Sequence, residues 1–510
     1  MDDNNSGAFG DQTPDAVVDD PAENRLQPVK RTRRPSIASI IISLVLVACA
    51  VTGVVILGTT HVVPARMMIP AVITDFVLVA VAVVLLLISR PRRHPVRFWL
   101  STILALVLAI ANVGVAKVGS DYLKVTSEIQ PPASDTVLYD VVVLTSGPTD
   151  VSQLAGTTMG EVANDPLSDA VHSHLTSLVN VSFQSSATWT ALVAALTGSD
   201  VTSIVIEDPF MQILSDADPD TYGTLRILTS FEIDSSLANT PPSPSPSPTT
   251  TMTNPDGAYI IYVSGIDTYG SISTRSRSDV NILVVVNPKT GKVLLVNTPR
   301  DFYVQLRGTT GLKDKLTHSG VYGINVSVGT MEDLYGINID YYLRINFSSL
   351  VTIIDALGGV DVNSAYNFSY GGYTFTQGMN HLNGAAALAF SRDRHDFALG
   401  DRIRGENQER VIEGVINKLS NPSVLVGYTR ILSSIQNSIQ TSMPQDVISE
   451  QVRQQLSTGQ SWSTTSISVT GGDGSEYTYS YPTQKLYVMI PDQSTVDAAK
   501  QQIQATLTGQ

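Results

Sequence analysis

The sequence predicts an α/β protein in which three membrane-spanning helices precede two α/β domains. Three apolar segments near the N-terminus are each long enough to cross a hydrocarbon core of ~30 Å as a helix. A tract rich in proline, serine and threonine then divides the remainder of the chain into two parts. On both sides of that tract, strand-like apolar runs alternate with segments of helical periodicity, which is typical of a sheet covered by helices.

The three apolar segments predict uncleaved transmembrane helices within residues 37–117. They are Ile37–Gly58, Ile69–Ile88 and Phe98–Ala116. A cleaved signal peptide is the alternative for the first segment, but such a peptide begins with a short basic region. Here an acidic and then basic tail, residues 1–36, comes first. We therefore expect a cytoplasmic tail followed by three helices that stay in the membrane.

Basic residues predict the orientation of these helices. Four arginines lie in the short loop of residues 90–97, whereas only one, Arg66, lies between the first and second segments. Because cytoplasmic loops carry the excess of lysine and arginine, we expect the tail and the 90–97 loop in the cytoplasm. Everything after Lys117, and thus both α/β domains, is then extracytoplasmic.

Composition and charge exclude several kinds of site. The only cysteine, Cys49, lies in the first predicted span, so the exported domains can form neither a disulfide nor a cysteine metal site. Asp75 in the second span is expected to snorkel to the membrane boundary or to hydrogen-bond between helices rather than to mark an ion path. The formal net charge is −14, and membrane topology explains the short basic clusters. We therefore predict no nucleic-acid partner.

The first exported part, residues 121–236, is predicted to be a small accessory α/β domain. Val137–Leu144 and Val201–Ile206 have the apolar runs of buried strands, and residues 169–196 carry helical periodicity. No cluster of residues in this domain predicts chemistry. The linker of residues 237–256 has little to bury and is expected to be an extended spacer, at ~3.1 Å per residue.

The second exported part, residues 257–510, is predicted to be a catalytic α/β domain with a mixed sheet covered by helices, together with its C-terminal extension. Strands are expected at Tyr259–Ser264, Val280–Val286, Lys292–Thr298 and Leu343–Asn346, the middle two forming a hairpin. Ser348 is expected to cap a helix that stops at Gly358 and Gly359, because apolar residues recur there at helical spacing. Two further helices are expected at Leu382–Arg392 and Arg402–Leu419.

Arginines and carboxylates gather in this second domain, although only 15% of the chain is charged. Arg300 follows the end of a predicted strand, where Pro299 stiffens the chain. Arg392 and Arg394 stand two apart in a segment that leaves a helix, so both guanidinium groups can hold one anion. The full set is Asp279, Arg300, Arg392, Arg394, Asp401, Arg404 and Gln408. It predicts a diphosphate held by arginines beside a divalent cation.

Strand order predicts where the cation binds. Asp267 follows one predicted strand and Asp279 precedes the next. If the two strands are neighbours, both carboxylates fall at the same edge of the sheet, where they predict a site for Mg²⁺, with Mn²⁺ as the alternative. Asp401, Arg404 and Gln408 are spaced to share one face of a helix. A structural ion pair is the alternative for any single pair, but so many arginines among so few charges favour a binding site.

Together these motifs resemble the signatures of the LytR-CpsA-Psr family over about residues 258–420. They are Arg277-Ser-Asp279, Asn297-Thr-Pro-Arg-Asp301, Lys313-Asp-Lys315, Arg392-x-Arg394 and Asp401-x-x-Arg404-Gly-x-Asn-Gln408. The three predicted spans and the accessory domain are similar to the capsule-attachment branch of that family. The segment that begins at His395 departs from the glycine-rich or acidic stretch often found in relatives, so the shape of that loop stays open.

The resemblance implies a membrane-bound phosphotransferase that moves a glycopolymer from an undecaprenyl-pyrophosphate carrier to the muramic acid of peptidoglycan. The implied catalytic residues are Arg300, Arg392, Arg394, Asp401 and Arg404. The implied pyrophosphate ligands are Arg277, Arg300, Arg392, Arg394, Arg404 and Gln408, and the implied Mg²⁺ ligands are Asp267 and Asp279. Asp401 either positions Arg404 or serves as a base. The expected partners are the lipid-linked glycan, peptidoglycan and membrane lipid, with the isoprenoid chain between the sheet and the helix that follows Ser348.

Other functions fit the same residues. A pyrophosphatase acting on the same lipid would accept water in place of a sugar hydroxyl. A noncatalytic wall-polymer binding or regulatory protein is a further alternative, chiefly for the accessory domain. Transcriptional regulation is disfavoured, because the arginine cluster is expected outside the cytoplasm. The sequence leaves open whether the polymer is capsule, teichoic acid or another glycan.

Overall fold

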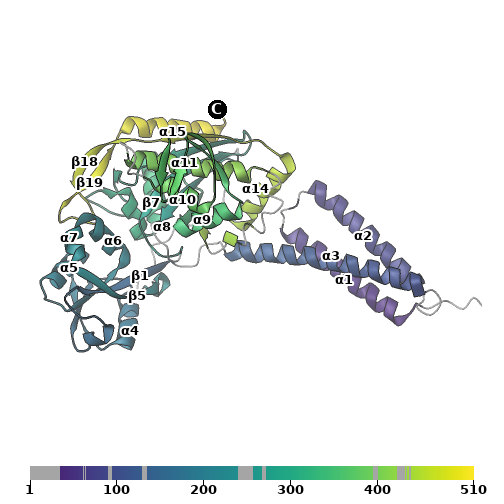
Figure 1. The fold of residues 1–510 in the computed structure, drawn as a ribbon, viewed down its shortest axis with the longest axis horizontal. Coiled ribbons are helices and arrows are strands. Elements are labelled where there is room, and N and C mark those ends of the chain that lie inside the picture. Colours follow the sequence, from purple (N-terminus) through teal and green to yellow (C-terminus); the bar gives the residue numbers. More distant parts are fainter. Residues whose placement is uncertain are drawn as a thin grey trace, which may run out of the picture.

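The computed structural model describes residues 35–60, 63, 65–89, 95–128, 135–238, 257–266, 272–393, 400–421, 431, 434–435 and 438–510. Residues 65, 125–128 and 400–402 are described by their backbone only. Three long helices form a bundle that projects away from two α/β domains (Figure 1). The predicted cytoplasmic tail up to residue 34 and the predicted Pro/Ser/Thr tract lie outside the described residues.

The helical bundle consists of α1 (Ile37–Thr60), α2 (Ala65–Ile88) and α3 (Pro95–Glu128). Each helix is long and apolar enough to cross a membrane, which agrees with the predicted three spans. Asn112 on α3 donates a hydrogen bond from Nδ2 to Oδ1 of Asp75 on α2, at 3.0 Å. Of the two roles expected for Asp75, snorkelling and an interhelical hydrogen bond, the structure shows the hydrogen bond. The third helix continues well beyond Lys117, where the sequence predicted its end.

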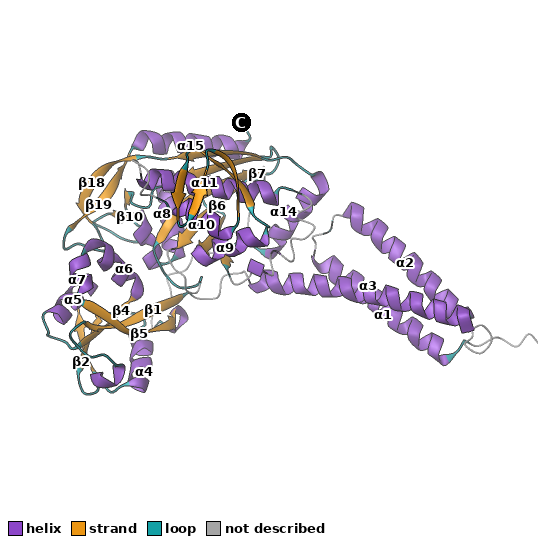
Figure 2. Ribbon diagram, viewed as in Figure 1, coloured by secondary structure: helices purple, strands orange, loops and turns teal. Residues whose placement is uncertain are grey.

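The accessory domain is a five-stranded sheet in the order β3-β2-β4-β1-β5, with helices packed on it (Figure 2). Its elements are β1 (Thr136–Leu144), β2 (Thr158–Val162), α4 (Ser168–Leu178), β3 (Ser182–Ser186), α5 (Trp189–Thr197), β4 (Ser203–Glu207), α6 (Asp208–Ala217), α7 (Pro219–Gly223) and β5 (Leu225–Asp234). The two predicted strands correspond to β1 and β4. The helical periodicity predicted over 169–196 corresponds to α4 and α5, but the sequence did not predict the strand β3 that separates them. This edge strand is polar and largely exposed, so it lacks the apolar run that would reveal it.

The C-terminal domain is built on a six-stranded mixed sheet in the order β16-β11-β6-β7-β8-β17. Its strands are β6 (Tyr259–Ile266), β7 (Ser278–Asn287), β8 (Lys292–Asn297), β11 (Tyr341–Asn346), β16 (Ile439–Thr441) and β17 (Ser463–Ser468). The β7–β8 pair is the predicted hairpin. Strand β6 pairs antiparallel with β7 and parallel with β11, while β17 pairs parallel with β8. The predicted mixed sheet is therefore confirmed.

Helices cover both faces of this sheet. On one face, α8 (Ile324–Tyr335) and α15 (Gln493–Thr508) bury apolar side chains against β6, β7 and β8. On the other face, α11 (Gly400–Leu419) and α14 (Gln445–Thr458) pack against the same strands. The remaining elements are β9 (Tyr303–Val304), β10 (Asp314–Lys315), the 3-10 helix η3 (Leu316–Tyr322), α9 (Phe347–Ala356), β12 (Val360–Ser364), β13 (Phe368–Tyr370), β14 (Tyr373–Phe375), β15 (Gly378–Leu382), α10 (Gly384–Arg392), β18 (Gly471–Tyr477) and β19 (Lys485–Pro491).

Helix α9 begins earlier than predicted. Its cap is Asn346, not Ser348: the Asn346 side chain accepts a hydrogen bond from the backbone N–H of Ser349 at 2.8 Å, and Ser349 Oγ accepts from the Asn346 backbone N–H at 3.2 Å. This reciprocal pair is a capping box. Asn346 is also the last residue of β11, so the sequence pattern assigned it to the strand alone. The helix ends before Gly358 and Gly359, both at positive φ, as predicted.

Candidate functional site

A cavity of about 440 Å³ opens where β6 and β11 end and β7 begins. Ligands of open α/β sheets commonly bind at the carboxyl ends of parallel strands, which is where β6 and β11 deliver the chain. Gly265 near the end of β6 lies where a Cβ would approach Val280 Cβ to 2.7 Å, so a glycine lets the two strands approach closely. The register shift between Gly265 and Ile266 lies at the same point.

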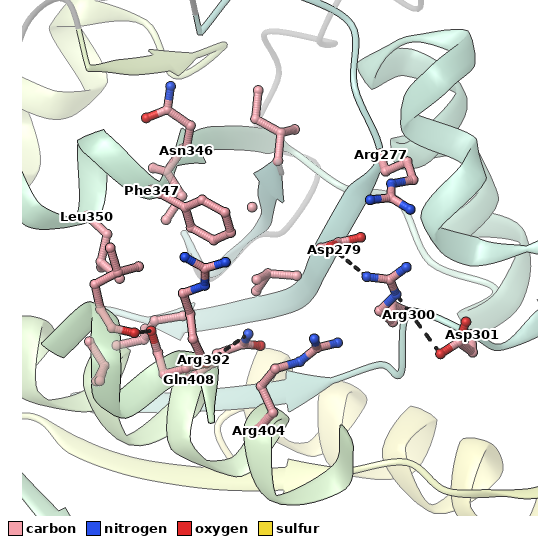
Figure 3. Close-up of a pocket in the computed structure, with 18 of the residues that line it drawn as sticks. Arg277, Asp279, Arg300, Asp301, Asn346, Phe347, Leu350, Arg392, Arg404 and Gln408 are labelled. Carbon is pink, nitrogen blue, oxygen red and sulfur yellow. Dashed lines mark hydrogen bonds and ion pairs between the residues drawn. The ribbon is translucent and has the colours of Figure 1, made fainter. Parts of the chain in front are cut away.

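Arginines from different elements point into this cavity (Figure 3). Arg277 precedes β7, Arg300 follows β8, Arg392 ends α10 and Arg404 lies on α11. Among the described residues, five basic side chains, counting Lys315, line the cavity against three carboxylates. The side chains of Arg277 and Arg300 are only 8% and 12% exposed. A polyvalent anion is the ligand that this excess of positive charge fits.

Asp279 fixes the position of Arg300. Its Oδ2 accepts a hydrogen bond from Arg300 Nη1 at 2.6 Å, and its Oδ1 accepts from Thr317 Oγ1 at 2.7 Å. Burial raises the pKa of Asp279, but the neighbouring arginines, Arg300 first, and the Thr317 hydroxyl outweigh burial and hold the pKa below its ordinary value. Asp279 is therefore an anion at neutral pH, and its pair with Arg300 aims that guanidinium before any ligand binds.

Arg392 and Arg404 reach the cavity from two consecutive helices. The guanidinium carbon of Arg392 lies 4.4 Å from the centroid of the Phe347 ring, a cation–π contact that holds the planar group at the cavity wall. Arg404 and Gln408 are one turn apart on α11, and both line the cavity. Between them, Gly405 approaches β8 so closely that a Cβ would overlap the Asn297 amide.

The opposite side of the cavity is apolar. Helix α9 supplies Phe347 and Leu350, and α10 and α11 supply Leu388, Val411 and Ile412. The sequence predicted that an isoprenoid chain would lie between the sheet and α9, and the apolar lining has the chemistry for such a chain. One cavity thus joins a cationic region to a hydrophobic one, as an amphiphilic diphosphate requires.

A second cavity of about 450 Å³ meets the first at the arginines. The two share Asp279, Arg300, Arg404, Gln408 and Tyr487, while the rest of the second lining mixes polar residues such as Ser468 and Asp473 with apolar ones such as Met489. Arg300 and Arg404 are therefore reached from both cavities.

The structure brings together six of the residues that the sequence singled out. Those that line the first cavity are Arg277, Asp279, Arg300, Arg392, Arg404 and Gln408. Asp267 and Arg394 lie outside the described residues. Asp401 lies in the first turns of α11, but its side chain is not among those described. The condition set for the metal site does hold, because β6 and β7 are adjacent strands and Asp279 lies at the start of β7.

Two residues in the cavity wall were missed by the sequence analysis. Lys315 belongs to the motif Lys313-Asp-Lys315, but the sequence predicted no role for it. Its Nζ lies 3.0 Å from Asp301 Oδ1, and both residues line the cavity. Asp216 comes from α6 of the accessory domain and forms an ion pair with Arg277. The expectation that the accessory domain carries no chemistry was therefore incomplete. No sequence signal revealed this contact, because it joins segments from different domains.

The metal site stays a prediction, because Asp267, one of its two expected carboxylates, lies outside the described residues. Among the described residues, no group of three or more His, Cys, Asp or Glu side chains is arranged to hold a metal. Mg²⁺ in phosphate chemistry is commonly held by one or two carboxylates and by the phosphates themselves. Asp279 has suitable chemistry, since it is anionic and each of its oxygens keeps a second lone pair beside its hydrogen bond.

Comparison with known proteins identifies the family. The chain is 34% identical over 194 residues to the polyisoprenyl-teichoic acid–peptidoglycan teichoic acid transferase TagU of Bacillus subtilis, which covers 38% of this chain and 62% of TagU. TagU of Bacillus licheniformis is 38% identical over 173 residues, and that alignment covers 34% of this chain and 56% of the relative. The crystal structure of B. subtilis TagV aligns with a TM-score of 0.42 and 27% identity, covering 49% of this chain and 97% of TagV.

These alignments span about three fifths of the curated relatives. The LytR_cpsA_psr family model matches a longer stretch, residues 226–503, which is more than half of the 510 residues. The match begins in β5 of the accessory domain and ends within α15. This protein therefore belongs to the LytR-CpsA-Psr family.

Proposed function

We propose that this protein is a membrane-anchored phosphotransferase that moves a glycopolymer from a polyprenyl-pyrophosphate carrier to peptidoglycan. The observation that carries the proposal is the convergence of Arg277, Arg300, Arg392 and Arg404 on one cavity whose far wall is apolar. A diphosphate between a lipid and a glycan needs both environments. The names of the TagU relatives, which are teichoic acid transferases, agree with this substrate class.

The chemistry proposed is displacement at the glycan-side phosphorus. A sugar hydroxyl of peptidoglycan attacks that phosphorus, the P–O–P bond breaks, and polyprenyl monophosphate leaves with the bridging oxygen. The product is a phosphodiester, and the hydroxyl proton passes to a base or to solvent. Such a transition state needs positioning and neutralisation of charge more than covalent assistance. The arginines supply both, and the second cavity, which meets the first at Arg300 and Arg404, offers the acceptor a route separate from the lipid.

Mg²⁺ is part of the proposal. Asp279 and Asp267 would hold it at neighbouring strand ends, where it would neutralise charge on the diphosphate. Replacing Asp279 by alanine is an unsuitable test, because this side chain is only 14% exposed and is paired with Arg300. Asp279→Asn keeps the shape, so loss of Mg²⁺-dependent turnover in a folded Asp279→Asn variant is the expected result. Turnover that a chelator leaves unchanged would remove Mg²⁺ from the proposal.

We also propose that both α/β domains lie outside the cytoplasm and that the carrier is undecaprenyl pyrophosphate. The basic 90–97 loop supports the orientation, and a phosphate-linked wall glycan such as teichoic acid or capsule is the proposed cargo. The cavity recognises the diphosphate and the start of the chain, so the identity of the glycan is set elsewhere.

The test is product analysis with the full-length protein in lipid nanodiscs, a polyprenyl-pyrophosphate carrying a labelled glycan, and peptidoglycan as acceptor. Label that becomes attached to peptidoglycan is the expected result. Free glycan phosphate would make the protein a pyrophosphatase, and intact donor would make it a noncatalytic binder. Arg300→Lys should lose turnover, whereas Arg307→Lys is the matched control, since Arg307 is 44% exposed and pairs with Asp333 rather than lining the cavity.

A further inference from the structure

The accessory domain packs directly against the part of the C-terminal domain that carries Arg277. The backbone N–H of Thr136 in β1 donates to Ser273 O at 3.2 Å, and the N–H of Arg275 donates to Thr136 O at 3.1 Å. On the other side of this segment, Gly320 in η3 lies so close that a Cβ would overlap Ser276 O. The chain leading to Arg277 is therefore held between the two domains.

An apolar cluster with side chains from both domains stabilises this interface. Trp189 of α5 is buried in one cluster with Val321, Tyr481 and Leu486 of the C-terminal domain. The indole Nε1 of Trp189 also donates to the backbone oxygen of Ser480 at 2.9 Å. A buried aromatic side chain with a satisfied polar atom is typical of a specific interface.

From this docked position, α6 places one carboxylate among the arginines. Oδ2 of Asp216 forms an ion pair with Nη1 of Arg277, and the same oxygen lies 3.7 Å from Nη2 of Arg300. The Asp216 side chain is 57% exposed, whereas those of its two partners are nearly buried. One oxygen between two guanidinium groups has the environment that a phosphate oxygen would have in the same place.

Helix stability does not explain an acidic residue at this position. Asp216 lies in the last turn of α6, which ends at Ala217. The macrodipole makes a negative charge unfavourable at the C-terminus of a helix. The two arginines offset this cost, and in return Asp216 reduces the repulsion between two guanidinium groups that share a cavity wall.

We propose that Asp216 is a displaceable counter-ion, by which the accessory domain holds Arg277 and Arg300 in place until the diphosphate of the donor takes over. The inference rests on the proposed function, because it needs a diphosphate as the competing anion. Donor binding and the Asp216–Arg277 tie are then mutually exclusive. A donor in the cavity loosens one link between the two domains, and departure of the product restores it.

The test measures binding of geranyl pyrophosphate to the full-length protein in detergent micelles by calorimetry at low ionic strength. Asp216→Asn keeps the shape but removes the competing charge, so binding should tighten about two- to five-fold, the range that exposed ion pairs span. Asp220→Asn is the matched control: this acidic residue on the neighbouring helix α7 is also exposed but does not line the cavity. In an Arg277→Gln background, Asp216→Asn should give a clearly smaller gain, because the pair it breaks is gone.

Unchanged or weaker binding by Asp216→Asn would overturn the counter-ion, as would an equal gain from Asp220→Asn, which would indicate only a long-range charge effect. The melting temperature should shift by less than about 2 °C, since Asp216 is more than half exposed. A wild-type protein that binds no geranyl pyrophosphate contradicts the proposed function itself. Wild-type binding with no response to Asp216→Asn refutes the counter-ion alone.

Discussion

Arg392 combines two interactions that lysine cannot reproduce together: a planar donor face toward the cavity and a stacked contact with Phe347. Lysine keeps the charge but loses the planar fork, so we expect Arg392→Lys to lose transfer nearly as severely as Arg392→Ala, on the order of 10²-fold. If Arg394 completes the clamp predicted from its spacing, the double variant should be little worse than either single one, because groups acting as a unit are not additive.

The measurements are transfer rate and melting temperature of the same preparations, with Arg307→Lys as the control. A structural role for Arg392 makes the opposite prediction: lysine would restore turnover, and the loss would be seen in the melting temperature.

Glu409 predicts a pH dependence of stability. Glu409 lies on α11 and is only 4% exposed. Burial raises the pKa of its carboxyl from the ordinary 4.5 to about 8. The folded protein therefore holds a proton that the unfolded chain releases, so the contribution of Glu409 to stability is most favourable below pH 4.5, falls as the pH rises toward about 8, and is level above it. Glu409→Gln is neutral throughout, so its melting-temperature advantage should grow between pH 5 and pH 8.

At about 1.4 kcal/mol per pKa unit, the gain for Glu409→Gln at the alkaline end is on the order of a few kcal/mol. Glu413→Gln on the same helix is the matched control. A difference between wild type and Glu409→Gln that is independent of pH would show that the buried carboxyl does not hold its proton.

At the scale of elements, local patterns in the sequence were enough where an element depends on its own residues. The apolar runs of β6 and the β7–β8 hairpin were predicted within a few residues, and α10 and α11 were recognised from their periodicity. The polar edge strand β3 and the cap at Asn346 were not, since β3 has no apolar face and Asn346 serves a strand and a helix together. The arginines of the site were predicted from their spacing in the sequence. Asp216 was not, because it reaches the cavity only through the docking of the accessory domain, which residue spacing does not encode.

The close packing of α11 against β8 at Gly405 predicts the effect of a larger side chain there. Gly405→Ala places a methyl group against the amide of Asn297. Either this buried amide must shift, or α11 must move away from the sheet and carry Arg404 and Gln408 with it. Overpacking of this kind costs about 1–3 kcal/mol. We expect a lower melting temperature together with a transfer rate reduced by roughly ten-fold or more, because misplaced catalytic groups lose much of their effect.

Removing the obstructing amide tests that explanation. Gly405→Ala combined with Asn297→Ala should recover part of the melting temperature lost by Gly405→Ala alone. Additive losses would mean that the two residues do not press on each other.

At the scale of the whole molecule, direct contacts join the helical bundle to the C-terminal domain. Tyr122 of α3 is 2% exposed and hydrogen-bonds Ser449 of α14, and Val452 and Leu456 of α14 pack against the same tyrosine. Arg66 at the start of α2 also donates to Leu456 O at 3.1 Å. The end of α3 and the start of α2 must therefore lie on the same side of the membrane as the arginine cavity. The cavity is thereby held at a set position relative to the helices that anchor it.

These contacts sharpen the prediction of membrane orientation. Helix α3 has 34 residues and is ~51 Å long, well beyond the ~30 Å hydrocarbon core, so its last turns emerge on the side of the C-terminal domain. With the arginine-rich 90–97 loop in the cytoplasm, that side is outside the cell. Alkaline phosphatase, which is active only outside the cytoplasm, should therefore be active when fused after Glu128 and inactive when fused at Arg93. A cytoplasmic reporter such as green fluorescent protein should give the complementary pattern at the same two positions, and the reverse result for both reporters would place the arginine cavity in the cytoplasm and rule out peptidoglycan as the acceptor.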